Sequence, residues 1–210
     1  GAAGLGAIAR DSLAAVRIVL GIPRLRRLLL FFWLPPAFAV APEALAVPYA
    51  ADLGHPGSGA GLLLAAGPVG LVAGEILAVR LLTQETRIRL IVPLGLVAFV
   101  PLLFFAAGPE LGIAIALLAA AGMSHASSLG LDQLLLEAIP EDLRGRAFSV
   151  ATAGIMLTQG LGFAVAGALG QALGLDLAIT LAGAGGLVAV AVLGPRIARG
   201  ARPAAESAAG

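Results

Sequence analysis

Long apolar runs alternate with short polar breaks along most of the chain. Each run is close to the ~20 residues that a helix needs to cross a ~30 Å hydrocarbon layer. The breaks are rich in Gly, Pro and polar residues, as turns are. The pattern predicts an all-α membrane protein, a six-transmembrane-helix bundle. We expect its spans at residues 28–50, 59–82, 90–107, 111–133, 147–170 and 175–195.

Two flanking segments lie outside the bundle expected at 28–195. Residues 1–27 form a predicted cytoplasmic linker, in which residues 5–22 place apolar side chains on one helical face and Arg10 and Arg17 on another. That pattern favours a helix lying at the membrane surface. The segment after Arg199 consists mainly of Ala, Pro, Ser and Glu, and residues 196–210 are predicted to be a disordered cytoplasmic tail. Because the first residue is not Met, we expect the chain to be a trimmed protein or part of a longer one.

Composition agrees with a membrane environment and excludes several other classes. Charged residues make up 12% and hydrophobic residues 60% of the chain, with a mean hydropathy of +1.02, whereas soluble domains carry about 25% charged residues. The chain has no Cys, and its two His residues are far apart, so we expect neither a disulfide nor a metal site. No phosphate-binding loop, hydrolase triad or nucleic-acid-binding basic patch is recognisable. We therefore predict no enzyme activity, no cofactor and no nucleic-acid partner.

The basic residues, all of them Arg, occupy alternate breaks. Arg residues precede the first span, flank the second break, lie in the fourth and follow the last span. The charged residues of the intervening breaks are acidic: Asp52, Glu110 and Asp176. The positive-inside rule then predicts both termini in the cytoplasm of a bacterial cell, with the spans in its inner membrane.

Small residues recur at a spacing of four in two spans, and prolines gather in another. The stripes allow helix backbones to approach closely, although surfaces that slide during a transport cycle remain an alternative. The first span holds four prolines, so we expect it to be kinked or interrupted. The stripes are Ala66, Gly70, Gly74 and Ala78 in the second span and Gly162, Ala166 and Gly170 in the fifth.

Three segments resemble the major facilitator superfamily. Residues 139–149 read Ile-Pro-Glu-Asp-Leu-Arg-Gly-Arg-Ala-Phe-Ser, which is similar to the loop between the fourth and fifth helices of a half of that fold. Residues 67–80 look like the second helix of a half, and residues 22–30 are similar to the linker into the seventh helix. The resemblance implies the C-terminal half of a twelve-helix, drug-exporter-like transporter. It also implies a partner N-terminal six-helix half, a small-molecule substrate and proton-coupled efflux.

One loop departs from the family pattern. After the second helix of a half the family commonly reads G-x-x-x-D-R-x-G-R-R, a network that closes the cytoplasmic side. Here Ala78 stands where the acid is expected, and Arg80 comes one place late. Glu75 or Glu85 is a candidate substitute for the missing acid.

Polar residues inside the spans are the candidates for a substrate or proton pathway, because ionisable groups in the hydrocarbon layer are costly without a function. Glu43 either faces a central cavity, where it exchanges protons or binds a cation, or is a carboxylate at the outer rim. His125 either hydrogen-bonds substrate or relays protons, or it is a neutral His satisfied by a neighbouring helix. Thr158 and Gln159 in the fifth span have the same two alternatives.

The cytoplasmic ends of the spans offer a candidate gate network. We expect a latch between acids near the end of the fourth span and arginines of the loop that follows, with solvated helix-end charges as the alternative. The network comprises Gly74, Glu75, Arg80, Asp132, Glu137, Arg144, Gly145 and Arg146. Trp33 and Tyr49, near opposite ends of the first span, are predicted interfacial anchors.

The function predicted from these features is secondary transport of a small molecule by alternating access between two halves. The competing hypothesis is a non-transporting six-helix scaffold that binds a partner protein. The direction of transport and the substrate do not follow from the residues.

Overall fold

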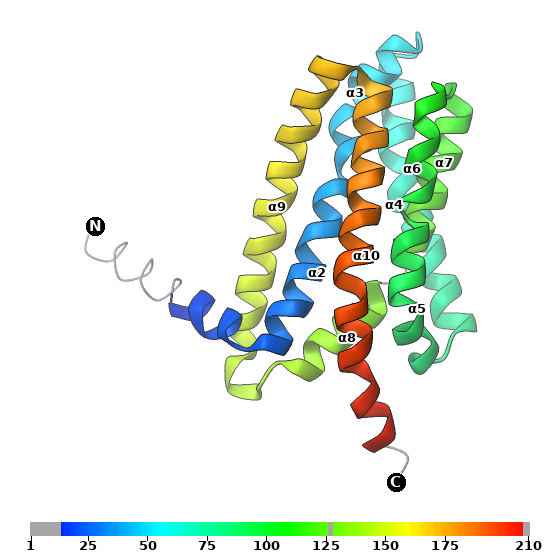
Figure 1. The fold of residues 1–210 in the computed structure, drawn as a ribbon. Helices are drawn as coiled ribbons and strands as arrows, with labels where there is room; N and C mark the ends of the chain where they lie inside the picture. The colour runs from blue at the N-terminus through cyan, green and yellow to red at the C-terminus, as the bar shows by residue number, and fades with distance from the viewer. Residues whose placement is uncertain (1–13, 126–127, 208–210) are drawn as a thin grey trace.

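The computed structural model describes residues 14–125 and 128–207, and the regular structure within those ranges is helical throughout. Its helices stand side by side as a bundle, with α8 lying across one end (Figure 1). The elements are α2 (Pro23–Ala39), α3 (Ala41–Asp52), α4 (Ser58–Leu81), α5 (Gln84–Val97), α6 (Val100–Leu103), η1 (Phe104–Ala107), α7 (Leu111–Ser124), α8 (Ser128–Ala138), η3 (Glu141–Leu143), α9 (Arg144–Leu173) and α10 (Leu175–Ser207).

Among the described residues, 5 helical segments are long and apolar enough to cross a membrane. They match the first, second, third, fifth and sixth predicted spans. Their bounds are Pro23–Asp52, Ser58–Leu81, Gln84–Ala107, Glu141–Leu173 and Leu175–Pro195.

The fourth predicted span, residues 111–133, is described as two helices on either side of residues 126–127, which lie outside the described residues. They are α7, of 14 residues, and α8, of 11 residues, and neither alone reaches the ~20 residues that a span requires. Polar side chains at the end of α7 bond back to its own carbonyls, with Ser124 Oγ donating to Ala120 O at 3.2 Å. Such back-bonding competes with helix continuation and bends helices.

The first span is interrupted, as its prolines predict. Helix α2 ends at Ala39 and α3 begins at Ala41, with Val40 between them. Pro35 and Pro36 lie within α2 and Pro42 lies in the first turn of α3. A proline removes the hydrogen bond to the carbonyl four residues earlier, so several carbonyls of this segment lack their helical donor.

Close helix contacts form where the sequence predicts them. Helix α4 packs along α7, and α2 packs between α9 and α10. The stripe residues Ala66, Gly70, Gly74 and Ala78 are all buried, and Ala166 and Gly170 are buried on α9. The prediction that both stripes serve helix contact is confirmed.

The outer surface of the bundle is apolar. Large side chains on α4 and α9 are widely exposed, among them Val69, Val72, Leu157 and Val165. Soluble monomers rarely expose continuous apolar surface of this kind, and a lipid bilayer is the solvent that fits it.

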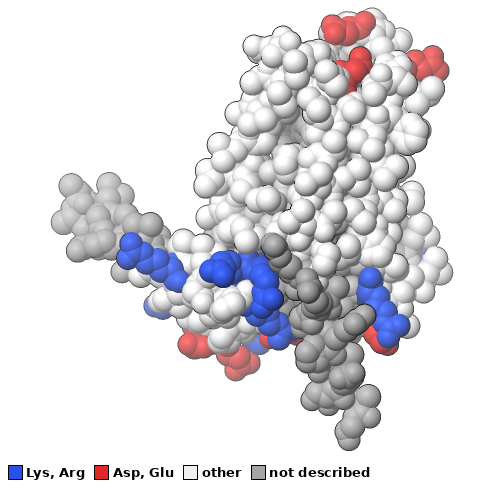
Figure 2. All heavy atoms as spheres, in the orientation of Figure 1, with Lys and Arg blue, Asp and Glu red and all other residues white. Residues whose placement is uncertain are grey.

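Charge is distributed unequally between the two ends of the bundle. Figure 2 shows the Arg side chains gathered toward one end, while the charged residues drawn at the far end are acidic. Asp52 ends α3, Glu110 precedes α7 and Asp176 lies in the first turn of α10. The first described residues and the C-terminal end of α10 both lie toward the arginine end (Figure 1).

The two flanking segments are described in part. Residues 14–21 are helical, whereas the rest of the predicted interfacial helix lies outside the described residues. Helix α10 continues to Ser207, through most of the tail that the sequence predicts as disordered. Alanine, the residue with the strongest helix propensity, recurs in this segment, which favours continuation of the helix.

Candidate functional site: a cavity inside the bundle

A cavity of about 400 Å³ lies inside the bundle. Its wall comes from the α2–α3 break, from α4 and α7, from the buried side of α5 and α6, and from residues of α8, α9 and α10. Small-molecule sites typically occupy 300–1,000 Å³ and are mostly apolar with a few placed polar groups. This cavity meets both conditions.

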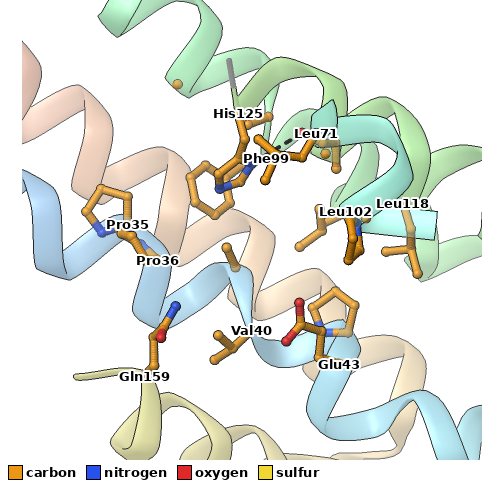
Figure 3. A pocket seen from close by; sticks show the side chains of 18 of the residues that line it. Pro35, Pro36, Val40, Glu43, Leu71, Phe99, Leu102, Leu118, His125 and Gln159 are labelled. Carbon is orange, nitrogen blue, oxygen red and sulfur yellow. Dashed lines mark hydrogen bonds between the residues drawn. The ribbon is translucent and has the colours of Figure 1, made fainter. Parts of the chain in front are cut away.

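Three of the four predicted pathway residues lie in its wall. Glu43 comes from α3, His125 follows the last turn of α7 and Gln159 comes from α9. Figure 3 shows the three side chains around one space, with Pro35, Pro36, Val40 and Phe99 between them. Residues from three separate parts of the sequence therefore meet in one apolar chamber.

Glu43 contributes to the cavity wall, and the residue is also exposed. Within the described part of the chain, the carboxylate makes no hydrogen bond and no ion pair. A carboxylate in an apolar wall without a partner is available to a proton or to a cationic ligand.

His125 is bound mainly to its own helix. Its Nδ1 lies 3.3 Å from Ala121 O, and its ring meets the ring of Phe99 edge-to-face with centroids 6.5 Å apart. Its Nε2 has no hydrogen-bond partner among the described residues. The imidazole is thus held by its own helix and by Phe99, and one ring nitrogen remains available to a ligand.

Thr158 lies outside the cavity wall, whereas its neighbour Gln159 lines it. Its hydroxyl lies within hydrogen-bonding distance of three carbonyl oxygens, at 3.2 Å from that of Trp33, 3.0 Å from that of Gly154 and 3.1 Å from that of Ile155. A hydroxyl has one proton to donate, so these carbonyls share it. The geometry favours helix packing, rather than ligand binding, for Thr158.

Prolines shape the wall in a way that the sequence analysis did not identify. Three pairs of wall residues consist of a helical proline and the residue four places before it. In each pair the earlier carbonyl has lost its helical donor. The sequence does contain this pattern, in which a proline follows an apolar residue at a spacing of four. The pairs are Phe31 with Pro35, Phe32 with Pro36 and Leu64 with Pro68.

Trp33 joins α2 to α9 instead of anchoring at a membrane interface. Its Nε1–H donates to Ala151 O at 2.9 Å, and its indole occupies the space where a Cβ on Gly154 would lie. The predicted anchor role for Trp33 is therefore corrected. Its ring fills a helix contact because a glycine on α9 leaves room for it.

Tyr49 is buried too. Its hydroxyl donates to Pro109 O at 3.0 Å, and its ring meets Phe105 edge-to-face. The hydroxyl therefore joins the end of α3 to the loop before α7, which corrects the prediction that Tyr49 is an interfacial anchor.

The predicted cytoplasmic latch is not formed in this structure. Glu137 accepts a hydrogen bond from Gln133 at 2.9 Å, and Arg144 pairs with Glu141 at 3.4 Å. Both contacts join residues three or four apart on one helical segment, where pairing needs no ordering of distant parts. In the described ranges, Arg80 and Arg146 form no ion pair.

The remaining gate residues occupy different surroundings. Glu75 on α4 and Asp132 on α8 lie close enough for their carboxylates to repel each other. Gly74 packs against the backbone of Met123, whereas Gly145 has open space around it. Glu85 pairs with Arg89 on its own helix. The structure thus brings two of the predicted acids together without an arginine between them.

Comparison with known proteins adds no family to this picture: no family model, no curated protein and no solved structure matches the chain. The helices themselves indicate an all-α membrane protein.

Proposed function

We propose that this chain is one six-helix half of a major facilitator transporter that exports a small molecule in exchange for protons. In this proposal the sixth crossing contains α7, in addition to the five long segments. Discontinuous helices beside a central site are a recurring feature of secondary transporters. The interrupted first span and the end of α7 at His125 both border the cavity, which supports the proposal.

The observation on which the proposal rests is the unpartnered carboxylate of Glu43 in an apolar cavity wall, facing the same space as His125 and Gln159. Glu43 takes up a proton when the cavity opens to the outside and releases it when the cavity opens to the cytoplasm. Gln159 and Nε2 of His125 hydrogen-bond the substrate. The apolar remainder of the wall contacts the body of the substrate.

The charge asymmetry supports a cytoplasmic location for the arginine end, in a bacterial inner membrane. The absence of Cys makes this orientation directly testable with single-cysteine variants. Ser58→Cys lies at the start of α4 and Gln84→Cys at the start of α5, at opposite ends of the bundle, and both positions are exposed. A membrane-impermeant maleimide should label Ser58→Cys in intact cells and Gln84→Cys only after permeabilisation. The reverse pattern would overturn the orientation.

Proton exchange is tested in inverted membrane vesicles that contain the complete gene product. Respiration acidifies the vesicle interior, which quenches an acridine dye, and an exported compound should restore fluorescence as protons leave. A panel of small amphipathic cations, neutral compounds and anions is added in turn. Glu43→Gln should abolish the response, and the matched control Glu110→Gln should not, because Glu110 is exposed at the start of α7 and outside the cavity wall.

Two results would reject the proposal. An undiminished response in Glu43→Gln removes the proton role of this carboxylate. A folded, membrane-inserted protein that responds to no compound of the panel favours the alternative function, a non-transporting scaffold.

A further inference from the structure

We propose that the cavity binds a monovalent organic cation with an aromatic or aliphatic body, and that this site is complete within these 210 residues. The inference rests on the proposed function for its role in transport, since it names the class of compound that such a transporter would carry. Binding itself requires neither a second half nor a proton gradient, so the two proposals can fail separately.

Charge is the first argument. Among the described residues, Glu43 is the one acidic residue in the cavity wall, and no described Arg contributes to that wall. The described arginines lie toward one end of the bundle, in the segments that flank the spans. An anion in the cavity would meet a like charge and no compensating cation, whereas a single positive charge would pair with Glu43. The wall therefore selects for one positive charge.

The surroundings of Glu43 are the second argument. Phe31, Phe32 and Phe99 contribute to the same wall, and aromatic faces attract organic cations. The carbonyls of Phe31 and Phe32 lack their helical donors because Pro35 and Pro36 follow them at a spacing of four. A carbonyl without its donor is a site of partial negative charge, so ring faces and backbone dipoles favour the same sign of ligand charge as Glu43.

The balance of polar and apolar surface is the third argument. Most of the wall is apolar, with residues such as Leu63, Leu71, Leu102 and Leu118. A small hydrated inorganic ion would lose its water here without the six or more oxygen ligands that an ion such as Ca²⁺ requires. A neutral apolar molecule would leave the Glu43 carboxylate desolvated and unpaired. An organic cation satisfies both the carboxylate and the apolar wall.

The experiment uses the 210-residue chain in nanodiscs of zwitterionic lipid, with empty nanodiscs subtracted. Three probes share one benzyl group: benzyltrimethylammonium is cationic, neopentylbenzene is its uncharged isostere and phenylmethanesulfonate is anionic. Equilibrium dialysis measures the binding of each. We expect the cation to bind roughly tenfold or more tightly than either of the other two, as one well-placed charge pair in an apolar site provides.

Variants assign the preference to Glu43. Glu43→Gln should lower affinity for the cation by roughly tenfold and leave the isostere within about twofold. Glu43→Asp should retain a preference for the cation, and Glu110→Gln should behave as the unmodified chain, because Glu110 lies outside the wall. Thermal unfolding in the same nanodiscs verifies that each variant is folded. If Glu43→Gln does not fold, Glu43→Asp is tested alone. Loss of the preference for the cation in a folded Glu43→Asp would overturn the proposal.

Three outcomes would overturn the cation site: equal binding of all three probes, no binding of any probe, or unchanged cation binding in Glu43→Gln. Binding with the expected charge preference but no proton movement in vesicles would reject the transport function and leave the site standing. Proton exchange that occurs equally with the cationic, uncharged and anionic probes would reject the cation site and leave the transport function standing.

Discussion

Two helix contacts in this bundle are built from glycines yet differ in kind. Helix α4 meets α7 backbone to backbone: a Cβ on Gly70 would overlap the carbonyl of Ala119, and one on Gly74 would overlap that of Met123. The closeness is reciprocal, since a Cβ on Gly122 would overlap the carbonyl of Gly67. Nothing but close packing joins the two helices at these positions, as in other membrane helix pairs with small residues.

The contact of α2 with α9 combines both kinds. A Cβ on Gly162 would overlap the carbonyl of Ala37, whereas nearer the start of α9 the space is filled by side chains. The indole of Trp33 lies over Gly154 and donates to Ala151 O, and Thr158 lies within hydrogen-bonding distance of Trp33 O. Immediately beside this contact, Pro36 of α2 and Gln159 of α9 line the cavity. The α4–α7 contact has few ways to rearrange, because backbones cannot be repacked. The part of the α2–α9 contact around Trp33 depends on rotatable side chains and therefore has alternative packings.

The largest effect should come from a methyl group placed in the backbone contact. Gly70→Ala forces α4 and α7 apart, because the new Cβ would overlap the carbonyl of Ala119. We expect a loss of about 3 kcal/mol of unfolding free energy, the upper part of the usual range for overpacking. Unfolding in detergent micelles titrated with sodium dodecyl sulfate measures it. The matched control is Gly61→Ala on the same helix, where a Cβ meets nothing within 4 Å; equal loss in both variants would contradict the comparison.

A methyl group in the side-chain contact should cost less. In Gly154→Ala the new Cβ would overlap the indole of Trp33, but a side chain can rotate away where a backbone cannot. The rotation breaks the bond from Trp33 to Ala151 O, so we expect a loss of about 1–2 kcal/mol in the same titration. Gly160→Ala on α9, with open space around its Cα, is the control. If Gly154→Ala is as disruptive as Gly70→Ala, the α2–α9 contact is as rigid as α4–α7.

Removing the indole hydrogen bond without a clash should have a smaller effect. Trp33→Phe retains an aromatic ring over Gly154 and loses the donor to Ala151 O. Hydrogen bonds between membrane helices average about 0.6 kcal/mol by double-mutant cycles, and we expect a loss of that order in unfolding free energy. The double variant with Gly154→Ala should lose less than the sum of the two single changes, because both act on the same indole. Strict additivity would show that the two residues do not share one contact.

Regular features of the sequence predicted much of the fold. The long apolar runs located the five spanning segments, the prolines predicted the break near Val40, and the spacing of Gly70 and Gly74 predicted a close helix contact. Each of these signals depends on neighbours along one helix. The fourth span stays a prediction, because α7 and α8 lie on either side of residues 126–127, outside the described ranges.

The site was predicted less completely, because it depends on which way side chains face after packing. Trp33 looked like an interfacial anchor by its place near the end of an apolar run. Its actual partner, Gly154, is more than 100 residues away, and no local pattern links the two. The same limit applies to the cavity: Glu43 and His125 were candidates by their chemistry, but that they share one chamber follows only from the arrangement of α3 and α7.

The smallest predicted effect separates two adjacent residues on α9. Thr158 bonds to carbonyls in the contact with α2, whereas Gln159 lies in the cavity wall. Thr158→Val should lower the unfolding free energy by about 0.5 kcal/mol and leave cation binding within about twofold, because the Trp33 carbonyl keeps its own helical donor. Gln159→Leu should do the reverse: it removes a polar group from the wall and should change probe affinity roughly threefold without loss of stability. Equal effects of the two variants on binding would mean that the side-chain contact and the cavity are one coupled unit.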